Sequence, residues 1–207
     1  MERWVLLRKG ADFEAIGKKY QISPRLACLI RNRDVIGEEA IERYLNGTIS
    51  DLYDGMLMKD ADKAIDILKE KIAEEKKIRV IGDYDIDGVN ATYILLEGLE
   101  RLGAYVDSDI PDRIGDGYGL NRHLIDRAYD AGIDTIITCD NGIAAANEIA
   151  YGKELGMTII VTDHHEIPFD EIDGEKIYRL PPADAVIDPK QKDCVYPFKG
   201  LCGAAVA

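Results

Sequence analysis

Acidic residues and histidines gather in three short stretches of this 207-residue sequence. The first, residues 82–88, reads GDYDIDG; the second is Asp140-Asn141-Gly142, and the third is Asp163-His164-His165. Together they hold five aspartates and two of the three histidines, namely Asp83, Asp85, Asp87, Asp140, Asp163, His164 and His165. Carboxylates that lie close together repel one another and raise one another's pKa values. A cluster of this kind therefore needs divalent cations as compensation.

The ligand types indicate which metal and which chemistry. Carboxylate oxygens and imidazole nitrogens without thiolates point to Mn²⁺ or Mg²⁺, and Mn²⁺ is preferred because Mg²⁺ rarely recruits imidazole. The Asp-x-Asp-x-Asp spacing, closed by Gly88, lets a turning loop aim several carboxylates at one point. Two ions about 3.5–4 Å apart would activate a water and hold the attacking and leaving oxygens of a phosphoryl group. The predicted chemistry is phosphoester hydrolysis.

Each stretch alone also has a simpler explanation. The DxDxDG pattern resembles a calcium loop, but an EF-hand carries a Glu at its twelfth loop position, where this sequence has Ile94. Asp140-Asn141-Gly142 is a common turn sequence, and Asp163-His164-His165 could be a capping acid beside two surface imidazoles. Three stretches with the same ligand chemistry favour a joint metal site.

The elements that would position these stretches follow from the hydrophobic pattern. Short β-branched runs alternate with amphipathic segments, and nearly continuous apolar strands indicate a parallel sheet covered on both faces. The pattern predicts strands at 78–81, 104–110, 135–138, 158–161 and 185–187, and helices at 89–102, 120–131 and 143–155. The fold class is α/β, a doubly wound, mostly parallel sheet with helices on both faces. Because the carboxyl ends of parallel strands share one edge, the three stretches converge there.

A helical N-terminal segment, residues 1–75, is predicted to pack on a catalytic domain, residues 76–207. Ser23-Pro24 is a typical helix start, a second helix is expected over 38–45, and Asp60 is expected to cap a third. After residue 166 the chain reads as loop-like. Because the last five residues resemble the beginning of a helix, we expect the catalytic domain to be truncated at its C-terminal end.

Composition limits the possible partners. The 26 Lys and Arg against 39 Asp and Glu give a net charge of −13, which argues against a broad basic surface, so any DNA contact must be local. No apolar run approaches the roughly 18–20 residues of a membrane span, and the N-terminus lacks the features of a secretory signal. We therefore expect a cytoplasmic protein without a membrane partner. The four cysteines lack metal-type spacing and are predicted to be buried free thiols.

At these residues the sequence resembles the DHH phosphoesterase superfamily, named for the triplet seen here as Asp163-His164-His165. Residues 82–88 resemble the first motif of the family, residues 140–143 the second and residues 162–165 the third. Similar flanking stretches occur at residues 111–113, 117–121, 180–189 and 200–204. The resemblance covers about residues 20–207 and is greatest to the branch of single-strand-specific DNA exonucleases.

The resemblance implies a metal-dependent phosphodiesterase. Its expected activity is that of a 5′-to-3′ exonuclease that hydrolyses single-stranded DNA to 5′-mononucleotides with two Mn²⁺ or Mg²⁺ ions. The resemblance makes Asp85, Asp87, Asp140 and His164 metal ligands, with Asp140 bridging and Asp83 as a further ligand.

The same resemblance assigns roles in catalysis and DNA binding. His165 would serve the phosphate or the leaving group, and Asp163 would orient the histidines. DNA contacts are expected from Arg113, Tyr118, Arg122 and His123. For the loop that contains Tyr118, a glycine turn with surface charges is the alternative.

Two departures from the family pattern keep other readings open. Pyrophosphatase-type members carry a His shortly before the first motif, where this chain has Ile81, which favours the exonuclease branch and leaves the first metal's ligand set open. Members of that branch continue into a fourth acidic motif and a substrate-binding domain, so activity of this chain alone is left open. The alternatives are a phosphodiesterase for oligonucleotides or cyclic dinucleotides, and a non-catalytic binding module.

Overall fold

The computed structural model describes residues 9–112, 119–172 and 174–207. The chain divides into two compact units, Met1–Leu52 and Tyr53–Ala207. The N-terminal unit contains α1 (Phe13–Tyr20), α2 (Pro24–Asn32), α3 (Glu38–Asn46) and a short 3₁₀ helix, η1 (Ile49–Asp51). As predicted, Ser23 caps α2, because its hydroxyl oxygen accepts a hydrogen bond from the Leu26 N–H at 3.2 Å.

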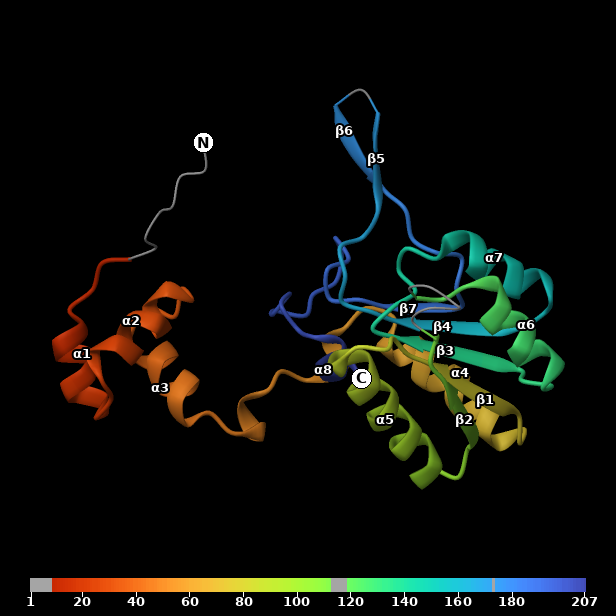
Figure 1. Cartoon of the computed structure of the whole chain (residues 1–207), viewed down its shortest axis with the longest axis horizontal. Helices are drawn as coiled ribbons and strands as arrows, with labels where there is room; N and C mark the ends of the chain where they lie inside the picture. The colour runs from red at the N-terminus through yellow and green to blue at the C-terminus, as the bar shows by residue number, and fades with distance from the viewer. Residues whose placement is uncertain (1–8, 113–118, 173) are drawn as a thin grey trace. The chain divides into compact units, whose positions relative to one another are not determined.

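The second unit is built on a five-stranded parallel sheet (Figure 1). Its strands are β1 (Lys77–Ile81), β2 (Tyr105–Asp109), β3 (Thr135–Cys139), β4 (Thr158–Thr162) and β7 (Ala185–Ile187). They lie in the order β2-β1-β3-β4-β7, and every neighbouring pair is parallel. The strand order reverses direction at β1, as in a doubly wound sheet, so the predicted fold class is confirmed.

Helices cover both faces of this sheet. They are α4 (Ala61–Ala73), α5 (Ile86–Arg101), α6 (Arg122–Asp130) and α7 (Ala146–Glu154), with a short η2 (Gly55–Leu57) before them and α8 (Gly203–Val206) after them. Leu124 of α6 and Ile149 of α7 belong to one buried cluster, which includes Ile136 of β3. Ala64 of α4 and Ala91 of α5 belong to a second cluster on the opposite face. Successive residues of each strand contribute to the two clusters in turn, because their side chains point to opposite faces of the sheet.

Helix α4 belongs to the second unit because it contacts β7 and buries Ala61 and Ala64. The second unit therefore begins before the domain boundary expected at residue 76. Asp60 precedes α4 as predicted, but its side chain makes no capping bond. Its carboxylate instead accepts a hydrogen bond from the Val186 N–H at 3.1 Å, which ties the start of α4 to β7.

The chain after residue 166 contains more structure than the sequence pattern predicts. Strands β5 (Phe169–Ile172) and β6 (Glu175–Tyr178) form an antiparallel hairpin that projects from the sheet (Figure 1). All of its strand residues are exposed, so the sequence has no alternation of buried and exposed positions from which the hairpin could be predicted. The four cysteines are free, as predicted, and Cys139 and Cys194 are buried. The predicted burial is wrong for Cys202, which is exposed, and for Cys28, which is only partly buried. Within the described residues, no helix has both the length and the apolar character needed to cross a membrane.

Candidate metal centre and active site

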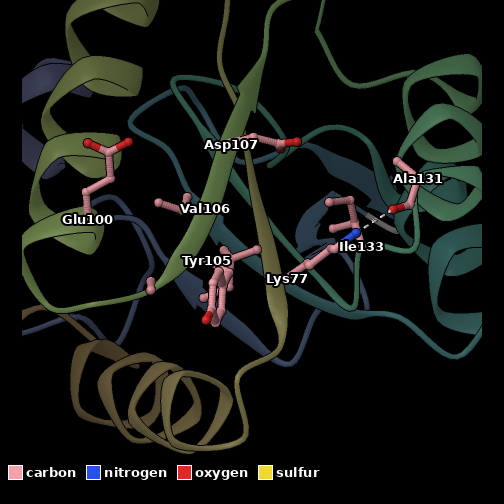
Figure 2. A pocket seen from close by; sticks show the side chains of 9 residues that line it. Lys77, Glu100, Tyr105, Val106, Asp107, Ala131 and Ile133 are labelled. Carbon is pink, nitrogen blue, oxygen red and sulfur yellow. Dashed lines mark hydrogen bonds between the residues drawn. The ribbon is translucent and has the colours of Figure 1, made fainter.

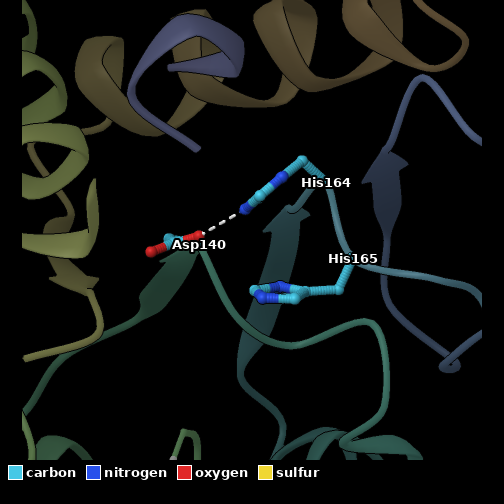
Figure 3. A group of neighbouring side chains, drawn as sticks. All are labelled: Asp140, His164 and His165. Atoms are coloured by element: carbon cyan, nitrogen blue, oxygen red, sulfur yellow. Dashed lines mark hydrogen bonds and ion pairs between the residues drawn. The ribbon is translucent and has the colours of Figure 1, made fainter. Parts of the chain in front are cut away.

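The three acidic stretches converge at the carboxyl edge of the sheet, as predicted. Asp83 lies just after β1, Asp140 just after β3 and Asp163 just after β4. Ligand atoms of Asp83, Asp85 and Asp140 all lie within 4.8 Å of one another, and so do those of Asp140, His164 and His165. Asp140 is common to the two groups. Figure 3 shows the Asp140 carboxylate and both imidazoles facing one space.

The loop after β1 is shaped by its own carboxylates. Asp85 caps α5, because its Oδ1 accepts hydrogen bonds from the N–H groups of Asp87 and Gly88 at 2.8 and 2.9 Å. Helix α5 therefore begins at Ile86, three residues before its predicted start. Asp83 is 1% exposed, burial raises the pKa of its carboxyl group, and its Oδ1 has no hydrogen-bond partner.

Asp140 occupies an unusual backbone conformation at the end of β3. Its φ is +59°, in the left-handed region that Asp tolerates better than most residues. The side chain is 2% exposed, and burial together with the nearby Asp87 carboxylate raises its pKa to about 6. The next residue, Asn141, donates to the carbonyl oxygens of Ile81 and Cys139 at 3.2 and 3.0 Å, which holds this loop against β1.

Asp163 organises the loop after β4. Its Oδ1 lies 2.7 Å from the His165 Nδ1 and accepts from the His164 N–H at 2.7 Å, while its Oδ2 accepts from the Ile143 N–H at 2.9 Å. Burial would raise the pKa of Asp163, but the hydrogen bonds from His165 and Ile143 outweigh it and lower that pKa. Helix α7 begins at Ala146, three residues after its predicted start at residue 143.

The two histidines have different partners. His164 Nε2 lies 2.8 Å from Asp140 Oδ1 and 3.5 Å from Asp87 Oδ2. The hydrogen bond to Asp163 raises the pKa of His165 above its ordinary value. Asp87 lies outside both groups of converging ligand atoms, and main-chain N–H groups near residue 203 bind its carboxylate.

The donor set fits a divalent cation. Among the ion pairs of described residues, the clustered aspartates pair only with His164 and His165, so lysine and arginine do not neutralise them. The unpartnered Oδ1 of Asp83 is a buried acceptor without a donor. Both facts are expected where oxygen and nitrogen ligands are arranged for a metal ion.

The predicted DNA-contacting residues are partly placed. Arg122 and His123 are exposed in the first turn of α6, and the Arg122 guanidinium lies 4.9 Å from the centre of the Tyr151 ring. Arg113 and Tyr118 lie outside the described residues. A cavity of about 470 Å³ adjoins the site and is bordered by residues that include Asn121, Asn141 and His165.

Another cavity, of about 440 Å³, lies at the opposite end of the sheet (Figure 2). Lys77 and Tyr105, the first residues of β1 and β2, line it, and the Lys77 ammonium group donates to the Ala131 carbonyl oxygen at 3.4 Å. None of the clustered acids or histidines lines this cavity. We therefore place the candidate chemistry at the carboxyl edge alone.

Two features of the site were not predicted. The main-chain N–H groups of Gly203 and Ala204 donate to the Asp87 carboxylate. A search of the sequence for ligand side chains cannot find such main-chain contacts. Asp188, which follows β7 and is fully buried, has a pKa that burial raises to about 6. The rule that acids after parallel strands meet at one edge could have included Asp188, since β7 belongs to the same sheet.

The parallel sheet and its edge of acids and histidines define a known class of protein. Residues 77–207 match the sequence model of the DHH family, N-terminal domain, and the chain belongs to this family. Over 206 residues it is 39% identical to the single-stranded-DNA-specific exonuclease RecJ of Bacillus subtilis (strain 168), covering 99% of this chain and 25% of that protein. RecJ of Escherichia coli (strain K12) is 33% identical, with 100% of this chain and 34% of that protein covered.

Solved structures give the same result. An exonuclease RecJ bound to manganese superposes with a TM-score of 0.61 and 34% identity, covering 72% of this chain and 35% of the other. RecJ of Thermus thermophilus in complex with Mn²⁺ has a TM-score of 0.65 and 27% identity, and the match covers 99% of this chain and 27% of the other. The chain thus corresponds to the N-terminal part of RecJ and spans about a quarter to a third of the curated relatives' length.

Proposed function

We propose that this chain is the N-terminal catalytic part of a RecJ-like exonuclease. Its reaction would be the metal-dependent hydrolysis of single-stranded DNA from the 5′ end to 5′-mononucleotides. The observation that carries the proposal is the pair of ligand groups that share Asp140, since a shared carboxylate is how two ions are held side by side. The names of the relatives and their manganese complexes support the choice of substrate and metal.

The metal-binding residues in this proposal are divided around Asp140. Asp83, Asp85 and Asp140 would hold one Mn²⁺ or Mg²⁺ ion. Asp140 and His164 would hold the other, and Asp87 would join them because its Oδ2 lies 3.5 Å from His164 Nε2. When bound, such ions supply an activated water and neutralise charge on the phosphoryl oxygens. Asp83 suits this role because its Oδ1 is buried without another partner.

His165 is the proposed proton donor, and Asp163 is its positioning residue. The 2.7 Å contact between His165 Nδ1 and Asp163 fixes the imidazole, and the raised pKa of His165 keeps more of the ring protonated near neutral pH. The Nε2 side can then donate to a phosphate or leaving oxygen. The adjoining cavity of about 470 Å³ provides room for the nucleotide.

The proposed DNA contacts are local, as the net charge of −13 requires. Arg122 and His123 at the start of α6 bind phosphates, together with Arg113, and Tyr118 stacks on a base. A DNA substrate also supports a cytoplasmic location for the protein.

The test is an assay, with Mn²⁺ and 5′-labelled or 3′-labelled oligonucleotides, of the full-length exonuclease to which this chain is proposed to belong. We expect release of mononucleotides from the 5′ end of single strands, little cleavage of duplex, and no cleavage by Asp140→Asn. Asp130→Asn, at the exposed end of α6, is the control and should match wild type. Equal cleavage of duplex, cleavage of dinucleotides alone, or activity retained by Asp140→Asn would contradict the proposal.

A further inference from the structure

The chain returns to the metal centre at the start of α8, where it contacts Asp87 through its backbone. The Gly203 N–H donates to Asp87 Oδ2 at 2.6 Å, and the Ala204 N–H donates to Asp87 Oδ1 at 2.8 Å. Because both oxygens are held, the Asp87 carboxylate cannot rotate without losing one of these bonds.

Gly203 also lies against Asp140. A Cβ atom at Gly203 would be 2.7 Å from both Cβ and Oδ1 of Asp140. Non-bonded atoms essentially never come this close to a Cβ atom, so a side chain at residue 203 would displace Asp140 or the chain at Gly203. Asp140 has little freedom to move away, because its own N–H donates to the Thr162 carbonyl oxygen and its Oδ1 contacts His164. Glycine is therefore needed here for close approach and not for a left-handed φ.

The segment that makes these contacts is anchored independently of the acids. Helix α8 contacts α5, and Ala204 and Ala207 pack against the hydrophobic cluster that contains Ala91. One rigid piece of main chain thus joins Asp87, on α5, to Asp140, at the end of β3.

We infer that Gly203 and Ala204 are positioning residues of the metal centre, which set the Asp87 carboxylate at a fixed distance from Asp140. This inference rests on the proposed function, because it treats Asp87 and Asp140 as metal ligands. An ordinary helix cap would explain the two N–H bonds by stability alone. It would not require the close contact between Gly203 and Asp140, and it predicts no effect on metal affinity in a folded variant.

The first test compares Gly203→Ala with Gly98→Ala in the 207-residue chain. Gly98 lies on α5, and a Cβ there would meet no atom within 4 Å. Mn²⁺ affinity is measured by calorimetry and by electron paramagnetic resonance without DNA, at a temperature where circular dichroism shows both variants folded. We expect Gly203→Ala to bind Mn²⁺ about 10–100-fold more weakly and Gly98→Ala to bind like wild type.

The second test replaces the Ala204 N–H that binds Asp87 and leaves Gly203 unchanged, in case Gly203→Ala does not fold. Ala204→Pro removes the N–H that Asp87 Oδ1 accepts, at a helix position where proline is tolerated. Ala205→Pro is the matched control, because the Ala205 N–H donates to the Cys202 carbonyl oxygen and not to Asp87. We expect weaker Mn²⁺ binding for Ala204→Pro only, with similar unfolding temperatures in EDTA.

The outcomes separate this inference from the proposed function. A wild-type chain that binds no Mn²⁺ overturns the metal centre and the inference with it. A wild-type chain that binds Mn²⁺, beside Gly203→Ala and Ala204→Pro variants of unchanged affinity, overturns the inference alone. The inference is also overturned if the two variants bind Mn²⁺ more weakly only because their metal-free forms are less stable.

Discussion

His165 and Asp163 form the closest pairing of a histidine with a buried acid in the described site, with 2.7 Å between Nδ1 and Oδ1. Asp163 is 1% exposed, and it also binds the backbone of both histidines and of Ile143. The orientation of the His165 ring is therefore set by a carboxylate whose own position is fixed by main-chain donors.

Replacing Asp163 by Asn should lower the pKa of His165 toward its ordinary value. Because the folded-state pKa is raised, the pairing stabilises the protein fully below about pH 6.5, and this stabilisation is lost as pH rises through the folded pKa. The measurement is an NMR titration of the metal-free chain, with the exposed His123 as internal control. The loss of a buried acceptor should also cost about 1–3 kcal/mol. A His165 pKa unchanged by Asp163→Asn would contradict this assignment.

Replacing Asp140 by Asn should stabilise the metal-free chain at pH 8 and abolish Mn²⁺ binding. The pKa of Asp140 is raised to about 6, so its contribution to stability is present below about pH 4 and is lost as pH rises through 6. Asn removes that penalty, by about 3 kcal/mol, and tolerates the left-handed φ.

The stability control is Asp188→Asn, because burial raises the pKa of Asp188 to about 6 as well. Chemical denaturation at pH 5 and 8 in EDTA should show a similar gain for both variants at pH 8. The metal-binding control is Asp130→Asn, at the exposed end of α6. Calorimetry with Mn²⁺ should show binding by Asp130→Asn and none by Asp140→Asn. Equal metal affinity in these last two variants would contradict the role of Asp140.

Gly88→Ala should unfold the loop after β1, whereas Gly98→Ala on the same helix should not. A Cβ at Gly88 would lie 2.5 Å from the Asp83 carbonyl oxygen and 2.6 Å from its nitrogen, so the loop backbone must shift. We expect a loss of about 3 kcal/mol and weaker Mn²⁺ binding. Gly98→Ala should gain about 0.5–1 kcal/mol from helix propensity. Thermal unfolding measures the stability of both variants. Equal stabilities of Gly88→Ala and Gly98→Ala would show that the loop has room for a Cβ atom at residue 88.

Arg122→Ala should weaken binding of single-stranded DNA in a salt-dependent manner. Loss of one phosphate contact should reduce the slope of log affinity against log salt by about 0.7. The control is Arg101→Ala, at the far end of α5, where Arg101 pairs with Glu97. Fluorescence anisotropy with a labelled oligonucleotide, with Ca²⁺ in place of Mn²⁺, provides the measurement. An unchanged slope would remove Arg122 from the DNA contacts.

The sheet and the convergence of acids were predictable because both depend on local pattern. Apolar runs such as residues 158–161 announce buried strands, and acids that follow parallel strands must meet at one edge. The convergence of Asp83, Asp140 and Asp163 follows from that rule, whereas the central position of Asp140 was expected only from the family resemblance. The metal-ligand and catalytic roles of individual residues stay predictions until they are measured.

Other features depend on contacts that residue types do not announce. Asp60 precedes α4, where a capping residue is expected, but its carboxylate accepts a hydrogen bond from the Val186 N–H instead. This contact depends on the position of β7, which the sequence around Asp60 does not indicate. The hairpin of β5 and β6 buries no residue, so no periodicity marks it. Gly203 offers no ligand atom of its own, and its proximity to Asp87 and Asp140 arises between segments that are distant in the sequence.

Asp85 is both the cap of α5 and a member of the group with Asp83 and Asp140. Any substitution at Asp85 therefore changes helix initiation and ligand charge at once, and a single loss of activity cannot be divided between them. Asp83 does not cap α5, and its Oδ1 has no hydrogen-bond partner. An engineer who wishes to alter which ion this scaffold prefers should begin at Asp83 and leave Asp85 intact.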